Sequence, residues 1–288
     1  MSESALDRSA LDKHPLPPVI DGGKESKGRI LIVAGSRGVP GAALLAATAA
    51  MRAGAGKLRI ATVESAAMTL AVAMPEAMVV GLPEGDDGGF AGGAVERIEE
   101  LARDVDAVVA GPGVKRSQVC KRLANVLLES QAALALDVAF LETLEPLHER
   151  ALDRISLPIL LPNADELASL LECEPKHVDE DPIGCGMRAA ELYRSVVLVK
   201  GVTSHLVTPA RECWTYEGGA PGLGVSGSGD VLAGIVGGLL ARGAEPLNAL
   251  LWSVWLHGEA GARVAEKIGP VGFLAREIAG EVPGLLPR

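Results

Sequence analysis

A run of small residues followed by an acid is the part of the sequence best suited to chemistry. Gly227, Ser228 and Gly229 precede Asp230, and the apolar residues after them recur at helical spacing, which predicts a helix over 228–242. The free N–H groups of its first turn would form an anion hole, because a helix N-terminus favours negative charge. Asp230 beside such a hole could be the base of a phosphoryl transfer. The alternative is an acid that only complements the helix dipole.

A lysine ends another apolar run, 196–200, which reads as a buried strand. Lys200 is followed by Gly201, so a phosphate or a nucleotide could approach it closely. A surface lysine before a turn is the alternative. Two further strand ends carry similar signals, since Asp137 closes the run 132–137 and a Gly-Pro-Gly turn follows 106–110.

The segment Pro-Asn-Ala-Asp-Glu follows the short strand predicted at 158–161. The amide of Asn163 and the carboxylates of Asp165 and Glu166 could hold a hydrated Mg²⁺ near phosphates. The alternative is a helix start, in which Asn163 is the N-cap and the two acids lie in the first turn.

Strands and helices alternate along the chain, which predicts an α/β fold with a mainly parallel sheet and helices on both faces. Ligands of such sheets bind beyond the carboxyl ends of the strands, where the polar residues above lie. Residues 1–27 are expected to be an irregular N-terminal arm, and 28–288 a single catalytic domain. The expected strands are 29–34, 57–62, 77–82, 106–110, 132–137, 158–161, 196–200 and a hairpin of 205–208 with 213–216; the expected helices are 41–52, 118–129, 165–171, 228–242, 246–267 and a short one near 273–279.

The charge balance argues against nucleic acid as the main partner. The chain has 27 Lys and Arg against 37 Asp and Glu, a net charge of −10, and 3% aromatic residues. Nucleic-acid binding needs concentrated positive charge, and base stacking needs aromatic rings. The sequence has no apolar run of membrane-spanning length and no signal-peptide pattern in its first residues, so we expect a cytoplasmic protein without a membrane partner. Four cysteines without a CxxC pair fit reduced thiols.

The motifs together resemble a known family. In order, they are LIVAGS, GVPGAALLA, MRAGAGKLRIAT, GPG, PNADE, VLVKG, GSGDVLAGI and WLHG, and the resemblance covers about residues 27 to 283. This pattern is similar to that of the ADP/ATP-dependent NAD(P)H-hydrate dehydratases, carbohydrate-kinase-type members of the ribokinase-like superfamily. The resemblance implies a three-layer sandwich, and a hydro-lyase that returns the S form of hydrated NADH or NADPH to NAD(P)H. It also implies ADP or ATP as co-substrate, Mg²⁺ as cofactor, and a homotetramer.

The resemblance also assigns roles to residues. It implies that Asp230 is the catalytic base and that the amides of Gly227, Ser228 and Gly229 stabilise the charge that develops on the phosphoryl group. The implied nucleotide-binding residues are Lys200, Gly201, Val202, Thr203, Ser204 and Gly229. The implied substrate-binding residues are Ala42, Ala43, Gly113, Asn163 and Asp230. Glu166 and Asn163 are expected to support Mg²⁺ through water.

The sequence departs from the family at three places. Asn163 to Glu166 replaces a usual His-Pro-Gly-Glu, Ala139 replaces a second acid after Asp137, and Ser226 precedes Gly227 where a glycine pair is expected. Asn-x-x-Glu is the arrangement of sugar and vitamin kinases, so an ATP-dependent small-molecule kinase is the alternative function. A nucleotide-binding protein without catalysis is a further alternative. We expect no fused epimerase domain, and we expect His257, on an apolar helix, to be a hydrogen-bonded core residue.

Overall fold

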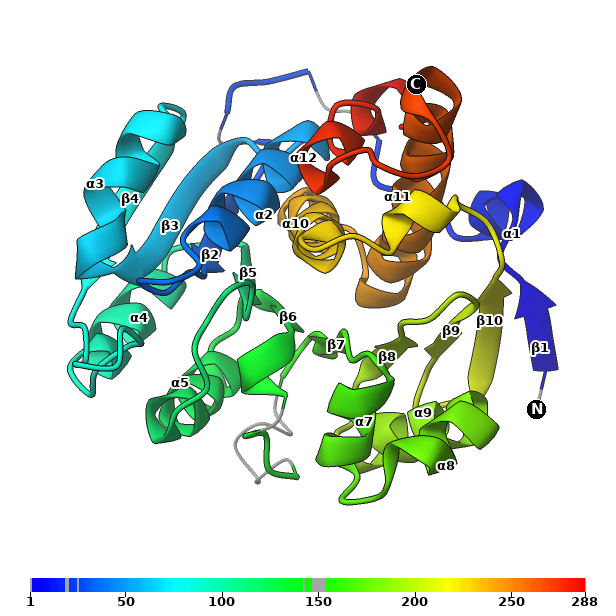
Figure 1. The fold of residues 1–288 in the computed structure, drawn as a ribbon, viewed down its shortest axis with the longest axis horizontal. Helices are drawn as coiled ribbons and strands as arrows, with labels where there is room; N and C mark the ends of the chain where they lie inside the picture. Colours follow the sequence, from blue (N-terminus) through cyan, green and yellow to red (C-terminus); the bar gives the residue numbers. More distant parts are fainter. Residues whose placement is uncertain (1, 19–20, 25, 142, 147–153, 288) are drawn as a thin grey trace.

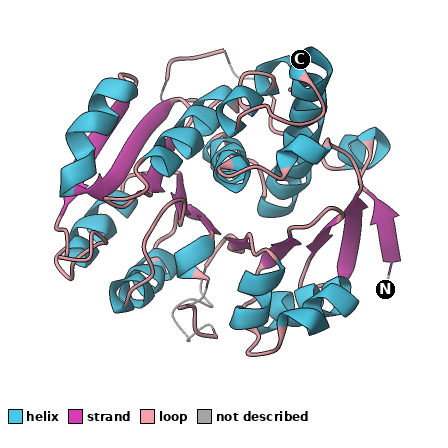
Figure 2. Cartoon of the chain, in the orientation of Figure 1, coloured by secondary structure: helices cyan, strands magenta, loops and turns pink. Residues whose placement is uncertain are grey.

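A single sheet runs through the molecule between two layers of helices (Figures 1 and 2). The computed structural model describes residues 2–18, 21–24, 26–141, 143–146 and 154–287. Within them, ten strands lie in the order β1-β10-β9-β8-β7-β6-β5-β2-β3-β4, and only β9 runs antiparallel to its neighbours. The strands are β1 (Ser2–Ala5), β2 (Arg29–Val33), β3 (Lys57–Val63), β4 (Ala77–Leu82), β5 (Ala107–Ala110), β6 (Ala133–Leu136), β7 (Ile159–Leu160), β8 (Val196–Val199), β9 (Ser204–Val207) and β10 (Glu212–Tyr216).

The helices divide between the two faces of the sheet (Figure 1). One face is covered by α2 (Gly41–Arg52), α10 (Ser228–Ala241), α11 (Pro246–Ile268) and α12 (Ala275–Ile278). The opposite face is covered by α4 (Ala94–Ala102), α5 (Gln118–Glu129), α7 (Ala164–Leu170), α8 (Pro175–Glu180) and α9 (Pro182–Leu192). The predicted α/β fold with helices on both faces is therefore confirmed. None of the described helices is long and apolar enough to cross a membrane.

The expectation of an irregular arm is wrong for its first part. Residues Ser2–Ala5 form β1, which extends the sheet parallel to β10, and Arg8–Lys13 form α1. The indole Nε1 of Trp252 donates a 2.8 Å hydrogen bond to the carbonyl of His14, which ties this segment to α11. A four-residue strand has no recognisable period of its own, and its pairing partner lies more than 200 residues away, so the local sequence does not reveal it.

Glycines in α10 allow this helix to pack closely against its neighbours. A Cβ on Gly234 would collide with the carbonyl oxygen of Ala46 in α2, and one on Gly237 would collide with Val109 in β5. Helix α10 is thus held between α2 and the sheet, and all but two of its residues are buried. This packing fixes the position of its N-terminus at the carboxyl ends of the parallel strands.

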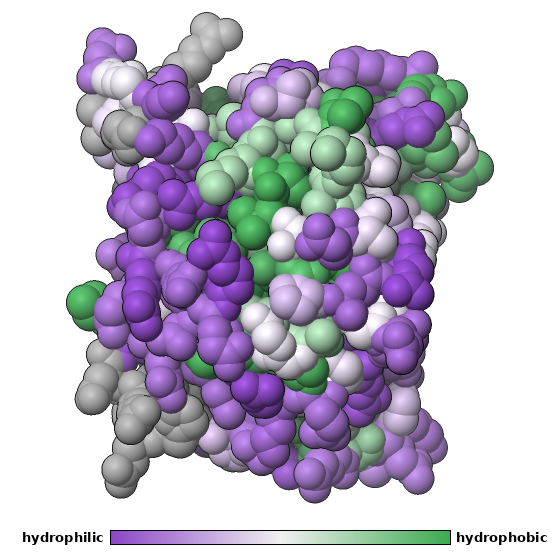
Figure 3. All heavy atoms as spheres, turned by 90° about the vertical axis from the view of Figure 1, so that its left-hand side faces the viewer, coloured by the Kyte–Doolittle hydropathy of each residue, from purple (hydrophilic) through white to green (hydrophobic). Residues whose placement is uncertain are grey.

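One side of the molecule carries exposed apolar residues. Helix α3 (Glu64–Ala73) packs beside β4, the last strand of the sheet. Met68 and Val72 on α3 are each 77% exposed, and Met78 on β4 is 55% exposed. Figure 3 views the molecule from this side and shows hydrophobic atoms gathered among hydrophilic ones.

Candidate active site

The N-terminus of α10 begins at a glycine in a left-handed conformation. Gly227 is the N-cap, with φ of +90°, and a Cβ on it would lie 2.6 Å from Cδ1 of Leu45. Both the angle and the close contact require glycine at this position. The N-cap provides no side-chain hydrogen bond to the first turn. The amide of Ser228, however, donates to the carbonyl of Val225 at 3.1 Å, so this N–H is already engaged.

Asp230 lies in the first turn of α10 and is partly buried. Burial raises the pKa of Asp230 to about 6, and the negative charge of Asp137 adds to this rise while Lys200 opposes it. A carboxylate with a pKa near 6 is largely ionised at pH 7 and still binds a proton readily. These are the properties expected of a general base that works near neutral pH.

Lys200 connects two carboxylates at the carboxyl ends of neighbouring strands. Its Nζ lies 2.8 Å from Oδ1 of Asp137, which follows β6, and 3.6 Å from Oε2 of Glu166, in the helix after β7. Burial lowers the pKa of Lys200, but the two carboxylates outweigh this effect and hold the pKa above the ordinary lysine value. Lys200 is therefore charged at neutral pH. A Cβ on Gly229 would lie 3.8 Å from its Nζ, so the ammonium group adjoins the α10 N-terminus.

Asn163 and Glu166 form a capping box at the start of α7. The Asn163 side chain accepts a 2.8 Å hydrogen bond from the Glu166 N–H, and Oε2 of Glu166 accepts one of 2.8 Å from the Asn163 N–H. The structure thus contains the helix start that was one of the two interpretations of this motif. Burial raises the pKa of Glu166. In the part of the chain that the structure describes, no group of three or more His, Cys, Asp or Glu residues could hold a metal ion.

A cavity of about 870 Å³ opens beside the α10 N-terminus. Of the predicted nucleotide-binding residues, Lys200, Gly201, Val202, Ser204 and Gly229 line it, whereas Thr203 is not among the lining residues. Ser228 and Asn163 also line it. The cavity therefore brings together residues that follow β7 and β8 with residues of the α10 N-terminus.

Sequence reasoning missed part of the cavity wall. The glycine-rich loop at 217–224 and His257 of α11 line the cavity, and neither was assigned a role. The loop could have been noticed as a second run of small residues before the GSGD motif. His257 is hydrogen-bonded, as expected; its partner is Ser228, and both residues line the cavity.

The predicted substrate-binding residues of the first half of the chain lie together at the turn after β2. Gly113 has φ of +65°, and a Cβ on it would lie 2.6 Å from Cβ of Ala42 and 3.5 Å from Cα of Gly35. Ala42 is 3% exposed and Ala43 is fully buried. The methyl groups of both alanines are thus packed under this turn, and neither they nor Gly113 lines the 870 Å³ cavity.

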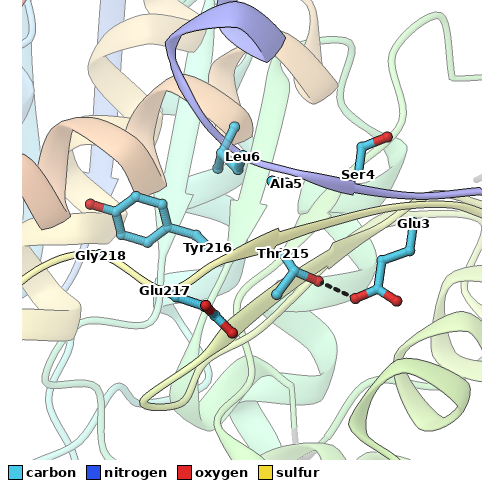
Figure 4. A pocket seen from close by; sticks show the side chains of 8 residues that line it. All are labelled: Glu3, Ser4, Ala5, Leu6, Thr215, Tyr216, Glu217 and Gly218. Carbon is cyan, nitrogen blue, oxygen red and sulfur yellow. Dashed lines mark hydrogen bonds between the residues drawn. The ribbon is translucent and has the colours of Figure 1, made fainter.

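A second, shallower hollow lies where β1 meets β10 (Figure 4). The hydroxyl of Thr215 donates a 2.9 Å hydrogen bond to the carboxylate of Glu3 there. The hollow contains none of the predicted site residues, although Tyr216, Glu217 and Gly218 also line the larger cavity.

Comparison with known proteins decides the family. The model of the NAD(P)H-hydrate dehydratase family matches residues 30–283. The chain belongs to this family. An ADP-dependent (S)-NAD(P)H-hydrate dehydratase of Xanthomonas campestris is 43% identical over 281 residues, which are 97% of this chain and 95% of that relative. The chain also matches bifunctional NAD(P)H-hydrate repair enzymes, of whose length it spans half.

Solved structures of other proteins share the fold. An ADP/ATP-dependent NAD(P)H-hydrate dehydratase of Bacillus subtilis, crystallised with ATP and Mg²⁺, aligns with a TM-score of 0.83 at 24% identity, over 98% of this chain and 97% of that one. A ribokinase-like superfamily protein of Enterococcus faecalis aligns with a TM-score of 0.81 at 22% identity, over 98% and 95%. The resemblance to NAD(P)H-hydrate dehydratases and the ribokinase-like fold, both predicted from the motifs, are therefore confirmed.

Proposed function

We propose that this protein repairs nicotinamide cofactors by dehydrating the S form of hydrated NADH or NADPH, coupled to cleavage of ADP. The observation that carries this proposal is the position of Asp230. It lies in the first turn of α10, after the Gly227–Ser228–Gly229 run, and interacts electrostatically with Lys200. Ser228, Gly229 and Lys200 line a cavity of nucleotide size, although Asp230 itself is not among the lining residues. The name of the Xanthomonas relative supports both the substrate and the choice of ADP.

The chemistry requires a better leaving group than hydroxide. The hydrate carries a hydroxyl at C6 of the nicotinamide ring. We propose that Asp230 takes the proton of this hydroxyl while the hydroxyl oxygen attacks the terminal phosphoryl group of ADP. A bond forms between that oxygen and phosphorus, and AMP leaves. The ring nitrogen then expels phosphate from C6, and the C5 proton passes to water, which restores the C5=C6 double bond. Water is thereby removed at the cost of one phosphoric anhydride bond.

The residues around Asp230 have separate parts in this scheme. The free amides at the α10 N-terminus stabilise the negative charge on the transferred group, because they are already oriented toward it. Lys200 neutralises phosphate charge, with its side chain held in place by Asp137. Residues 201–204 and the glycine-rich loop enclose the adenosine part of the nucleotide. Ala42, Ala43, Gly113 and Asn163 are proposed to border the hydrate, the alanines by letting the backbone approach closely.

Mg²⁺ is proposed as a cofactor that neutralises charge on the nucleotide phosphates. Glu166 fits a role through water, since its carboxylate is partly buried near Lys200 and binds only one backbone N–H. Mg²⁺ usually keeps several waters and needs only one or two protein carboxylates. A tetramer and a cytoplasmic location also stay predictions.

The kinase alternative differs in its products. A kinase leaves a stable phosphorylated substrate, whereas the proposed reaction leaves free phosphate, AMP and NAD(P)H. We expect ³¹P NMR of hydrated NADH incubated with the protein, Mg²⁺ and ADP to show equal amounts of AMP and inorganic phosphate. A lasting phosphate ester of the nicotinamide ring, without free phosphate, would establish the kinase function instead. The same incubation with ATP decides between the two nucleotides.

A further inference from the structure

The side-chain hydroxyl is the hydrogen-bond donor of Ser228 that remains available to an anion. Its amide is engaged with the carbonyl of Val225, so only its hydroxyl can serve a phosphoryl group. That hydroxyl lies 3.0 Å from Nε2 of His257, and the carbonyl oxygen of Ser228 lies 3.1 Å from the same nitrogen. The two residues are 29 positions apart, at the start of α10 and in the middle of α11, and both line the cavity.

The two contacts fix which nitrogen of His257 carries the proton. A carbonyl oxygen can only accept a hydrogen bond, so the contact at 3.1 Å is favourable only when Nε2 carries a hydrogen. A protonated Nε2 cannot accept from the Ser228 hydroxyl, which therefore has its lone pairs toward His257 and its hydrogen free to point elsewhere. Burial lowers the pKa of His257 to about 4, so the ring is neutral at pH 7 and carries this single hydrogen.

We propose that His257 is a positioning residue that turns the Ser228 hydroxyl into a hydrogen-bond donor for the terminal phosphoryl group of the nucleotide. The inference rests on the proposed function, because it requires a nucleotide in this cavity. It assigns the contribution of Ser228 to the side chain, in contrast to the amide that the family resemblance implied. A neutral imidazole performs this task without adding a charge that would attract the carboxylate of Asp230.

A double-mutant cycle tests whether His257 acts through Ser228. The variants are Ser228→Ala, His257→Phe, which keeps a ring and removes the N–H, and the combination of both. Loss of a hydrogen bond to a charged group is expected to lower kcat about 10- to 150-fold in each single variant. Because both changes remove the same hydrogen bond, the double variant is expected to be no slower than Ser228→Ala.

A second histidine variant separates positioning from structural support. His257→Gln keeps an N–H donor and is expected to recover part of the rate lost in His257→Phe, at a similar melting temperature. The proposal would be overturned if the rate losses of the two single variants multiplied in the double variant. It would also be overturned if both His257 variants lost rate in parallel with a fall in melting temperature.

ADP affinity, measured by calorimetry on the same variants, keeps the two proposals distinguishable. We expect Ser228→Ala and His257→Phe each to weaken ADP binding, again without multiplying in the double variant. If the parent protein binds ADP but does not turn over hydrated NADH, the proposed function fails while the cycle in ADP affinity still tests His257. Unchanged ADP affinity together with unchanged kcat in His257→Phe would refute the positioning role.

Discussion

Asp230 is the residue on which the proposed chemistry depends. Its carboxylate is the proposed general base, and loss of such a base lowers rates by about 10² to 10⁴. We therefore expect Asp230→Asn, which keeps the shape of the side chain, to lose turnover by that factor. ADP binding measured by calorimetry should persist, because the α10 amides and Lys200 remain. Near-normal turnover of hydrated NADH by this variant would exclude the role.

The pH dependence follows from the raised pKa of Asp230. The base must be ionised to act, so kcat/KM is expected to rise with pH through about 6 and to level off above it. Asp137 contributes to the raised value through its negative charge. Asp137→Asn removes that charge and leaves Lys200 without its 2.8 Å partner, and both changes lower the pKa of Asp230.

The acid limb of the pH profile should therefore move to lower pH in Asp137→Asn. The measurement is kcat/KM against pH for both proteins, with melting temperature as the control. An acid limb that stays at the same pH, or moves to higher pH, would contradict the coupling of Asp137 to Asp230.

The regular elements could largely be predicted from the sequence. The bounds of α2, α5 and β4 agree with the prediction, because apolar runs, Gly54 after α2 and Ser117 before α5 mark their ends locally. Of the described helices, five were not predicted: α1, α3, α4, α8 and α9. Helix α3 begins directly at the end of β3 without a turn or a side-chain cap, so no signal separates it from the strand.

The sequence predicts the site residues that directly follow a strand. Lys200, Asp137 and Asn163 follow parallel strands, and strand ends meet at one edge of such a sheet. The contact of His257 with Ser228 could not be predicted, because it depends on how α10 and α11 pack. The burial of Ala42 and Ala43 also depends on packing, here between α2 and the Gly35 turn.

A substitution at Gly229 tests whether the N-terminus of helix α10 binds the nucleotide. It does not have the positive φ of Gly227, and the nearest atom to a Cβ would be Lys200 Nζ at 3.8 Å. Gly229→Val should therefore fold, while its branched side chain occupies the space of a phosphate. We expect a large loss of ADP affinity in calorimetry at nearly unchanged melting temperature. Unchanged ADP affinity would mean that the residues 227–229 form only a turn and do not bind the nucleotide.

Gly227→Val is the matched variant for this experiment. Its φ of +90° and the contact with Leu45 make a side chain costly there. It is expected to lower the melting temperature clearly, in contrast to Gly229→Val.

A substitution at Glu166, in the first turn of helix α7, tests whether this residue supports Mg²⁺. Glu166→Gln removes the charge but keeps an oxygen that can accept from the Asn163 N–H, so the capping box survives. We expect turnover of this variant to require more Mg²⁺ at unchanged melting temperature. Asn163→Ala is the control for the cap, with an expected loss of about 1 kcal/mol in stability. An Mg²⁺ curve identical to that of the parent protein would leave Glu166 as a capping residue only.

At the scale of the whole molecule, the exposed apolar residues of α3 support the proposed tetramer (Figure 3). Met68 and Val72 are one helical turn apart and each 77% exposed. Exposed apolar patches often mark contacts between proteins. We expect light scattering to give about four times the chain mass of 29.6 kDa. Met68→Glu combined with Val72→Glu should give smaller particles; a parent protein of single-chain mass would contradict the assembly.

Recovery of the reduced cofactor tests the central claim most directly. Hydrated NADH lacks the absorbance band of dihydronicotinamide, so dehydration can be followed as the return of that band. With the protein, Mg²⁺ and ADP, we predict that the band returns, that one phosphate appears for each NADH restored, and that neither change occurs without nucleotide. No return of the band with either ADP or ATP, in a sample that binds nucleotide and melts cooperatively, would contradict the account.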